Sequence, residues 1–213
     1  MENIKNIIFD YGNVIFDLDF HEGQKAWMAL GIENPGKFYD FKITDNVFDA
    51  FEKGEIAPGE FRNYIRGKSR NQLLTDKQID TAWNSILIGI EKGKHELLLN
   101  LKSKYRTFLL SNINAIHYDY IHKYLKSDFG FDNNEHLFEK IYYSHLVGKR
   151  KPDPAIFKQV LNENNLNADE TLFIDDNAQN IEAAKKLGKK THLLTAPDTI
   201  LQLFSGPSGA LLL

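Results

Sequence analysis

The sequence is organised around the stretch Asn6-Ile7-Ile8-Phe9-Asp10-Tyr11-Gly12-Asn13-Val14, close to the N-terminus. Its apolar run, Ile7-Ile8-Phe9, has β-branched members and is followed by the turn residues Gly12-Asn13. Such a run predicts a fully buried strand that ends in a sharp turn. Asp10 follows the strand directly, at the carboxyl end where open α/β sheets bind their ligands.

A second acidic strand end lies far along the chain. The run Thr171-Leu172-Phe173-Ile174 also predicts a buried strand, and Asp175-Asp176 follows it. Two adjacent carboxylates repel each other unless a cation or a proton intervenes. Capping of a turn or helix explains one such Asp but not both. Together with Asp10, this pair predicts a site for a hard cation, and Mg²⁺ is the expected ion.

Composition bounds the class of protein. The chain has 213 residues, of which 42% are hydrophobic and 26% charged, as in an ordinary globular protein. Its formal charge of −3 gives no reason to expect a nucleic-acid partner, and the basic cluster at 149–151 is too local to form one. The sequence contains no cysteine, which excludes disulfides, thiolate zinc sites and cysteine nucleophiles.

No signal for a membrane was found in the sequence. It contains no apolar run of about 18 residues, so we expect no membrane span. The first strand begins almost at the N-terminus, without a signal-peptide pattern. We therefore expect a cytoplasmic protein.

Strands and helices alternate along most of the chain. After the strand at 7–9, further strands are predicted at 106–110, 140–143, 171–174 and 191–194. Helices are predicted at 91–102, at 115–126, from 154, where proline stands in the first turn, and at 178–187. This alternation predicts an α/β fold, a Rossmann-like parallel sheet with helices on both faces.

The first crossover is interrupted by a long helical insertion. Residues 21–88 show no convincing strand, and residues 15–20 read as a short hairpin or an extended connector. We expect two units, a catalytic core of residues 1–18 and 89–213 and a helical unit of residues 19–88. The insertion is rich in aromatic residues, which we interpret as its core: Phe38, Phe41, Phe48, Phe51 and Phe61.

Four elements in chain order, Asp10, Ser111-Asn112, Lys151 and Asp175-Asp176, resemble the four motifs of the haloacid dehalogenase superfamily of hydrolases. The resemblance covers nearly the whole chain, and the inserted helices resemble that family's helical cap domain. The local sequence at residues 9–14 and 149–153 is similar to that of a subgroup that contains sugar-1-phosphate phosphatases. The resemblance implies a Mg²⁺-dependent phosphatase of a small phosphorylated metabolite, with a sugar 1-phosphate as one candidate.

The same resemblance implies roles for the motif residues. Asp10 attacks phosphorus and forms an aspartyl-phosphate, which splits one hard displacement into two easier ones. Lys151 is the second catalytic residue and holds Asp10 and the phosphate oxygens as a point charge. The Ser111 hydroxyl and the Asn112 amide bind a phosphate oxygen.

Implied metal ligands and a substrate contact complete the site. Mg²⁺ is bound by the Asp10 carboxylate, the backbone carbonyl of Gly12 and Asp176, with Asp175 assisting and Asn180 in a supporting position. The resemblance also places the loop at 51–56 over the active site. There Lys53 or its neighbour Glu52 meets the part of the substrate that does not react.

One position departs from the family pattern. Most phosphatases of this superfamily carry a second Asp two residues after the nucleophile, as general acid and base, and here that position is Gly12. A general acid or base contributes roughly 10²–10⁴-fold to the rate. We therefore expect phosphate release to depend steeply on how acidic the leaving alcohol is. Asp17 and Asp19 are interpreted as turn or cap residues rather than as substitutes.

Two other functions remain open from the sequence. In a 2-haloacid dehalogenase the same Asp attacks carbon without a metal, but those enzymes usually have an aromatic residue at the position of Gly12, and the Asp175-Asp176 pair favours a metal. In a catalytically impaired relative, the fold would bind phosphate or a partner protein without turnover. The absence of an acid/base at Gly12 is the observation that favours this last class.

Overall fold

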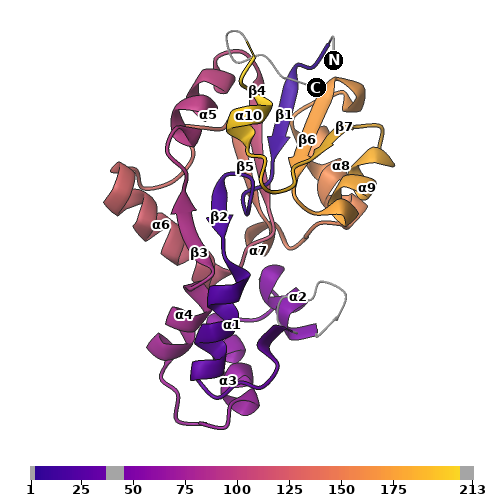
Figure 1. The fold of residues 1–213 in the computed structure, drawn as a ribbon. Coiled ribbons are helices and arrows are strands. Elements are labelled where there is room, and N and C mark those ends of the chain that lie inside the picture. The colour runs from indigo at the N-terminus through magenta and orange to yellow at the C-terminus, as the bar shows by residue number, and fades with distance from the viewer. Residues whose placement is uncertain (1–2, 37–45, 207–213) are drawn as a thin grey trace.

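The computed structural model describes residues 3–36 and 46–206 of the chain. Its larger sheet has five parallel strands in the order β5-β4-β1-β6-β7 and forms the upper half of the molecule in Figure 1. Its strands are β1 (Asn6–Phe9), β4 (Arg106–Ser111), β5 (Lys140–Tyr143), β6 (Thr171–Asp175) and β7 (Lys190–Leu193). The parallel sheet predicted from the alternation of strands and helices is confirmed.

Helices cover both faces of this sheet. One face packs against α5 (Lys94–Lys102), α6 (Ala115–Phe129) and α10 (Ile200–Leu203), and the other against α8 (Pro154–Glu163) and α9 (Ala178–Lys185). Alternate residues of β1 enter the two cores, because side chains of a strand point to opposite faces in turn. Ile7 and Phe9 join the first core, and Ile8 joins the second.

A two-stranded antiparallel ribbon leads out of the sheet toward the inserted helices. Its strands are β2 (Phe16–Leu18) and β3 (Leu87–Ile90). The helical interpretation is therefore wrong at residues 87 and 88, and residues 15–20 form neither a local hairpin nor a plain connector. The partner of β2 lies at the far end of the insertion, so no local pattern could reveal the pairing.

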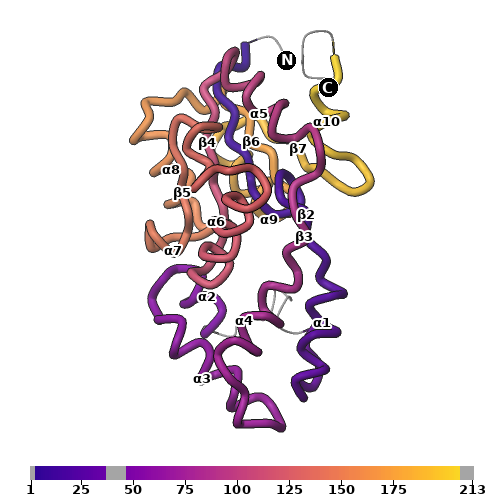
Figure 2. The backbone as a smooth tube through the Cα atoms, turned by 90° about the vertical axis from the view of Figure 1, so that its left-hand side faces the viewer, coloured from indigo at the N-terminus to yellow at the C-terminus, as the bar shows by residue number. Residues whose placement is uncertain are grey.

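Among the described residues, four α-helices lie between the two ribbon strands and form a group below the sheet in Figures 1 and 2. They are α1 (Phe20–Ala29), α2 (Asn46–Glu52), α3 (Pro58–Lys68) and α4 (Asp76–Asn84). The group has its own buried cluster, in which the rings of Phe51 and Phe61 stack with centroids 4.3 Å apart. Phe48 packs at the edge of this cluster, whereas Phe38 and Phe41 lie outside the described residues.

Two shorter elements complete the described chain, α7 (Ser144–Val147) and the 3₁₀ helix η2 (Ala168–Glu170). Within the described residues, no helix combines the length and the apolar character that crossing a bilayer requires.

Candidate active site

The carboxyl ends of three neighbouring strands meet at one edge of the sheet. β1 lies between β4 and β6, and Phe9 pairs in register with Leu109 and Ile174. Asp10 then continues β1 by one residue and donates its backbone N–H to Ile174 O at 2.9 Å. This register brings Asp10 level with Leu110, one residue before Ser111, so the predicted residues of two motifs lie at the same edge of the sheet.

Lys151 reaches this edge from the loop before α8. Its ammonium nitrogen lies 2.6 Å from Oδ1 of Asp10 and 2.7 Å from Oδ2 of Asp175. The Lys151 side chain is 1% exposed, so its ion pairs with Asp10 and with Asp175 are both buried. The structure thus brings three of the predicted site residues into direct contact.

The side chain of Asn112 fixes the main chain of Lys151. Its amide nitrogen donates to Lys151 O and its carbonyl oxygen accepts from Lys151 N–H, both at 2.8 Å. The sequence predicts that the Asn112 amide binds a phosphate oxygen. In the structure both polar atoms of this side chain form hydrogen bonds with the main chain of Lys151. Asn112 thus places the ammonium group at the strand ends, while buried Ser111 lines the cavity beside it.

Three carboxylates gather at this point. Asp10, Asp175 and Asp176 each offer an oxygen atom, and these oxygens all lie within 4.8 Å of one another. One ammonium group, that of Lys151, pairs with two of them. The cluster therefore keeps an excess of negative charge, and an oxygen-only donor set of this kind suits a hard divalent cation.

The two adjacent aspartates have different partners. Asp175 is fully buried, and besides Lys151 its carboxylate accepts from Asn177 N–H at 2.8 Å and from the Asn180 amide at 3.0 and 3.1 Å. Asp176 is less buried, and its Oδ2 accepts from Asn13 Nδ2 at 2.8 Å. Asp175 is thus held by protein donors, whereas Asp176 faces the cavity. Asn180 supports the cluster through Asp175.

The electrostatics of the cluster follow from burial and from like charge. Burial raises the pKa of Asp10 to about 8, an effect that Lys151 opposes and that Asp175 and Asp176 reinforce. Burial also raises the pKa of Asp176, against the Asn13 hydrogen bond. Burial lowers the pKa of Lys151, but the two carboxylates beside it outweigh this and leave its pKa above 10.5. An added cation would relieve the repulsion.

Leu18 fills the space beside Gly12, the position without an acid/base. A Cβ atom at Gly12 would lie 2.8 Å from Leu18 Cδ1. Neither nearby aspartate takes that place: Asp19 is a cap residue, as interpreted from the sequence, whereas Asp17 lies in β2 and is not a turn or cap residue. Asp17 pairs with the buried ammonium of Lys94 at 2.6 Å, and Asp19 caps α1 by accepting two backbone N–H groups.

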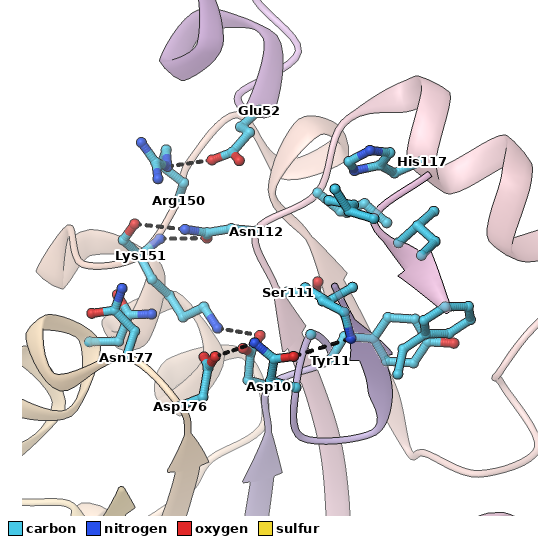
Figure 3. A pocket seen from close by; sticks show the side chains of 18 of the residues that line it. Asp10, Tyr11, Glu52, Ser111, Asn112, His117, Arg150, Lys151, Asp176 and Asn177 are labelled. Atoms are coloured by element: carbon cyan, nitrogen blue, oxygen red, sulfur yellow. Dashed lines mark hydrogen bonds and ion pairs between the residues drawn. The ribbon is translucent and has the colours of Figure 1, made fainter. Parts of the chain in front are cut away.

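A cavity of about 330 Å³ opens above the strand ends, between the sheet and the inserted helices. Figure 3 shows Asp10, Ser111, Lys151 and Asp176 at its floor, with Glu52 entering from α2 on the side opposite to Asp10. Gly12 and Asn180 also line it. All but two of the predicted site residues therefore line this cavity. The exceptions are Asp175, which is buried behind it, and Lys53.

Lys53 is not among the described residues that line the cavity. It directly follows α2, and its ammonium pairs with Asp49, four residues earlier, at 2.5 Å. Its neighbour Glu52 does line it, and Glu52 Oε2 lies 2.9 Å from Arg150 Nε, an ion pair without hydrogen-bond geometry. Arg150 Nη1 also donates to Asp49 Oδ1 at 2.9 Å. Two acidic residues of α2 are thus joined to the residue that precedes Lys151.

Sequence analysis missed Arg150 and Asp49. Arg150 belongs to the basic cluster at 149–151 and to the stretch 149–153 that carries the family resemblance, but neither pattern predicts a role for its own side chain. Its position next to Lys151 was the available signal, but its partners on α2 are distant in sequence. Asn13 and Leu18 were missed for the same reason, because their roles depend on contacts made across the fold.

Comparison with known proteins agrees with this geometry. Residues 40–194 match the family model described as haloacid dehalogenase-like hydrolase. The chain is 31% identical over 188 residues to a D-ribitol-5-phosphate phosphatase of Bacteroides thetaiotaomicron, covering 88% of this chain and 90% of that protein. It is 26% identical to a sesquiterpene phosphatase of Aspergillus oryzae, covering 93% and 94%.

A solved structure is similar to this chain over most of its length. It is a haloacid dehalogenase-family enzyme of Bacteroides thetaiotaomicron in complex with magnesium and inorganic phosphate, 38% identical, with a TM-score of 0.83. The match covers 92% of this chain and 96% of the other. The four motifs in order, the strand-end carboxylates and these matches lead to one assignment: the chain belongs to the haloacid dehalogenase-like hydrolases.

Proposed function

We propose that this chain is a Mg²⁺-dependent phosphatase that hydrolyses a small phosphate monoester through an aspartyl-phosphate on Asp10. The observation that carries the proposal is the cluster of three carboxylates around the Lys151 ammonium at the strand ends. Its relatives support the reaction class, since two are phosphatases by name and one was solved with magnesium and phosphate. Because one relative is a D-ribitol-5-phosphate phosphatase, a sugar or polyol phosphate is one candidate substrate.

The residues divide the work by position. Asp10 attacks phosphorus, and the ester oxygen leaves on the opposite side, toward the inserted helices. Lys151 and Ser111 hold phosphate oxygens beside the nucleophile. Asn112 positions Lys151 through its two main-chain hydrogen bonds.

The residues present fit the cation that such a reaction needs. Asp10, Asp176 and the Gly12 carbonyl would hold Mg²⁺, while Asp175 and Asn180 brace the ligands from behind. When bound, the cation offsets the repulsion between the attacking carboxylate and the phosphate dianion. The excess negative charge of the protein cluster is what makes the site complementary to it.

The division into two units is part of the proposal. Residues 19–88 act as the cap, and residues 1–18 with 89–213 as the catalytic core. The separate hydrophobic cluster of α1 to α4 and the narrow β2–β3 ribbon support such a division. Glu52 and Arg150, rather than Lys53, are then the charged groups that face the bound ester.

A second candidate is favoured by one observation. Leu18 occupies the space beside Gly12, and Asp17 and Asp19 are engaged elsewhere, so no acid/base stands at the usual position. A protein with this site could bind phosphate without turning over an ester. Retention of Asp10, Lys151 and the other two carboxylates favours the phosphatase.

Phosphate release, measured with Mg²⁺, with EDTA and after Mg²⁺ is restored, separates the candidates. The phosphatase predicts release that EDTA stops and Mg²⁺ restores, and that the Asp10→Asn variant lacks. Phosphate binding without release from any ester supports the second candidate. Halide release from a 2-haloacid that is unaffected by EDTA would show a dehalogenase instead.

A further inference from the structure

One wall of the cavity is lined by apolar side chains. Side chains from the ribbon, from the inserted helices and from the core contribute to it together. Among them are Leu18, Phe20, Phe48, Trp83, Ile113 and Ile121. Because Glu52 and Arg150 pair with each other on the side opposite to Asp10, this apolar wall is the part of the cavity left for the organic part of the ester.

The polar atoms on this wall are already used by the protein. Trp83 Nε1 donates to Asn114 Oδ1 at 3.2 Å. His117 Nε2 lies 3.0 Å from Trp83 O, which can only accept, so Nε2 carries the proton. Nδ1 of the same ring then accepts from the Asn114 amide at 3.1 Å. Hydroxyl groups of a ligand would find no partner in these two side chains.

The charged groups at the other flank are paired with one another. Arg150 lies between Asp49 and Glu52, and Asp49 also accepts from Lys53. These contacts join α2 to the core at the rim of the cavity. Because the groups neutralise each other's charge, they are not free to bind the hydroxyl groups of a substrate.

Leu18 extends the apolar surface down to the reacting end. Its Cδ1 stands where a side chain at Gly12 would begin, as described above. A buried hydroxyl without a partner costs free energy, whereas each buried methylene contributes favourably. The shape and chemistry of the wall therefore select against a polyol and for a hydrocarbon.

We infer that the physiological substrate is a phosphate monoester of an apolar alcohol, whose hydrocarbon part binds against Phe20, Trp83 and Ile113. This inference rests on the proposed phosphatase function and names the substrate class of that same site. It places the preference in the wall of the cavity, not in the charged residues of α2.

The test is a series of primary alkyl phosphates, ethyl, butyl and hexyl, with D-ribitol 5-phosphate as the polyol comparison. The alkyl leaving groups have similar acidity, so the series isolates burial from leaving-group chemistry. We expect kcat/KM to rise with chain length by up to about fourfold per buried methylene, and D-ribitol 5-phosphate to fall below butyl phosphate. This comparison needs no variant.

Two variants on α1 locate the effect. Phe20→Gln should reduce the ratio of kcat/KM for hexyl over ethyl phosphate, because it puts an amide into the wall. Met28→Gln, at a residue that is 56% exposed on the same helix, should leave that ratio unchanged.

The outcomes separate the inference from the function on which it rests. A flat chain-length series, or D-ribitol 5-phosphate as the best ester, overturns the apolar substrate class while the phosphatase stands. No phosphate release from any ester overturns both. A rising series that Phe20→Gln flattens supports the inference.

Discussion

Lys151 and Asp10 form a buried ion pair, with Nζ of the lysine 2.6 Å from Oδ1 of the aspartate. The lysine also bonds to Asp175, so one ammonium holds the proposed nucleophile against the base of the acidic cluster. Asn112 fixes the main chain of that lysine from the neighbouring strand. The site is therefore preorganised by four segments that are far apart in sequence.

Replacing Lys151 with Met tests this pair. The variant keeps the length of the side chain but removes the charge that orients Asp10 and holds phosphate, so kcat should fall by about 10²–10³-fold. Steady-state kinetics at saturating Mg²⁺ measure the change. Lys149→Met is the matched control, because Lys149 bonds to Gln159 instead of the cluster. Equal kcat in both variants would show that the ammonium of Lys151 has no part in the reaction.

Because Gly12 stands where most relatives carry the acid/base, we expect the rate of alcohol release to depend steeply on the acidity of the leaving alcohol. Without an acid at that position, release of the alcohol should slow as the alcohol becomes less acidic, and the dependence is measured with a series of substituted aryl and alkyl phosphates. Gly12→Asp should raise the rate for the poorest leaving groups by at most about 10²–10⁴-fold.

Leu18 sets the condition for that gain. The new Cβ would meet the end of the Leu18 side chain at 2.8 Å, so Gly12→Asp combined with Leu18→Ala should gain more than Gly12→Asp alone. Circular dichroism confirms the fold of both variants first. A first step in the unaltered protein that is insensitive to leaving-group acidity would mean that another residue already donates the proton.

Arg150 predicts a coupling between the inserted helices and the core. Arg150→Met and Asp49→Asn each remove one partner of the 2.9 Å contact, so each should lower kcat/KM if the contact keeps the cavity closed. In a double-mutant cycle the second change should cost less than it does alone, with a coupling of about 0.5–3 kcal/mol. Arg106→Met, which breaks a pair with Glu139 away from the site, is the control. Strict additivity would argue against a closing contact.

His117 predicts a pH dependence of stability. Burial lowers the pKa of His117 to about 4, from an ordinary value of 6.5, so the folded protein holds the ring neutral. Between these values the unfolded chain binds more protons, and stability falls as the pH decreases from 6.5 toward 4. The shift corresponds to about 3 kcal/mol.

The measurement is urea unfolding at a series of pH values, for the unaltered protein and for His117→Gln. The variant loses the ring that stacks on Trp83, so its stability at pH 8 should be lower. Its curve between pH 4 and 6.5 should nevertheless be flatter, because the other titrating groups are common to both proteins. Parallel curves would assign the acid sensitivity to other residues.

The sequence predicted the parts of this site that depend on local pattern. Asp10 and Asp175-Asp176 were found because each follows a short, continuously apolar run, which a strand buried on both faces produces. The parallel sheet followed from the alternation of such runs with helices. The helix starting at Pro154 and the cap at Asp19 were equally local signals.

What the sequence could not predict depends on contacts between distant segments. β2 pairs with β3 across the whole insertion, so the ribbon was missed and residues 87 and 88 were assigned to a helix. The loop at 51–56 was placed over the site through the family resemblance. Which of its charges enters the cavity depends on the rotation of α2, and the structure selects Glu52 over Lys53.

The most direct test of the central claim is to trap the enzyme during turnover of an aryl phosphate. Expulsion of an acidic phenol needs little protonation, whereas hydrolysis of the aspartyl-phosphate lacks an acid/base at Gly12, so the phosphorylated enzyme should accumulate. Acid quenching and peptide mass spectrometry should find a phosphoryl group on the peptide that contains Asp10, and none in Asp10→Asn. Phosphate release with that peptide unmodified, or with the phosphoryl group on another residue, would contradict Asp10 as the nucleophile.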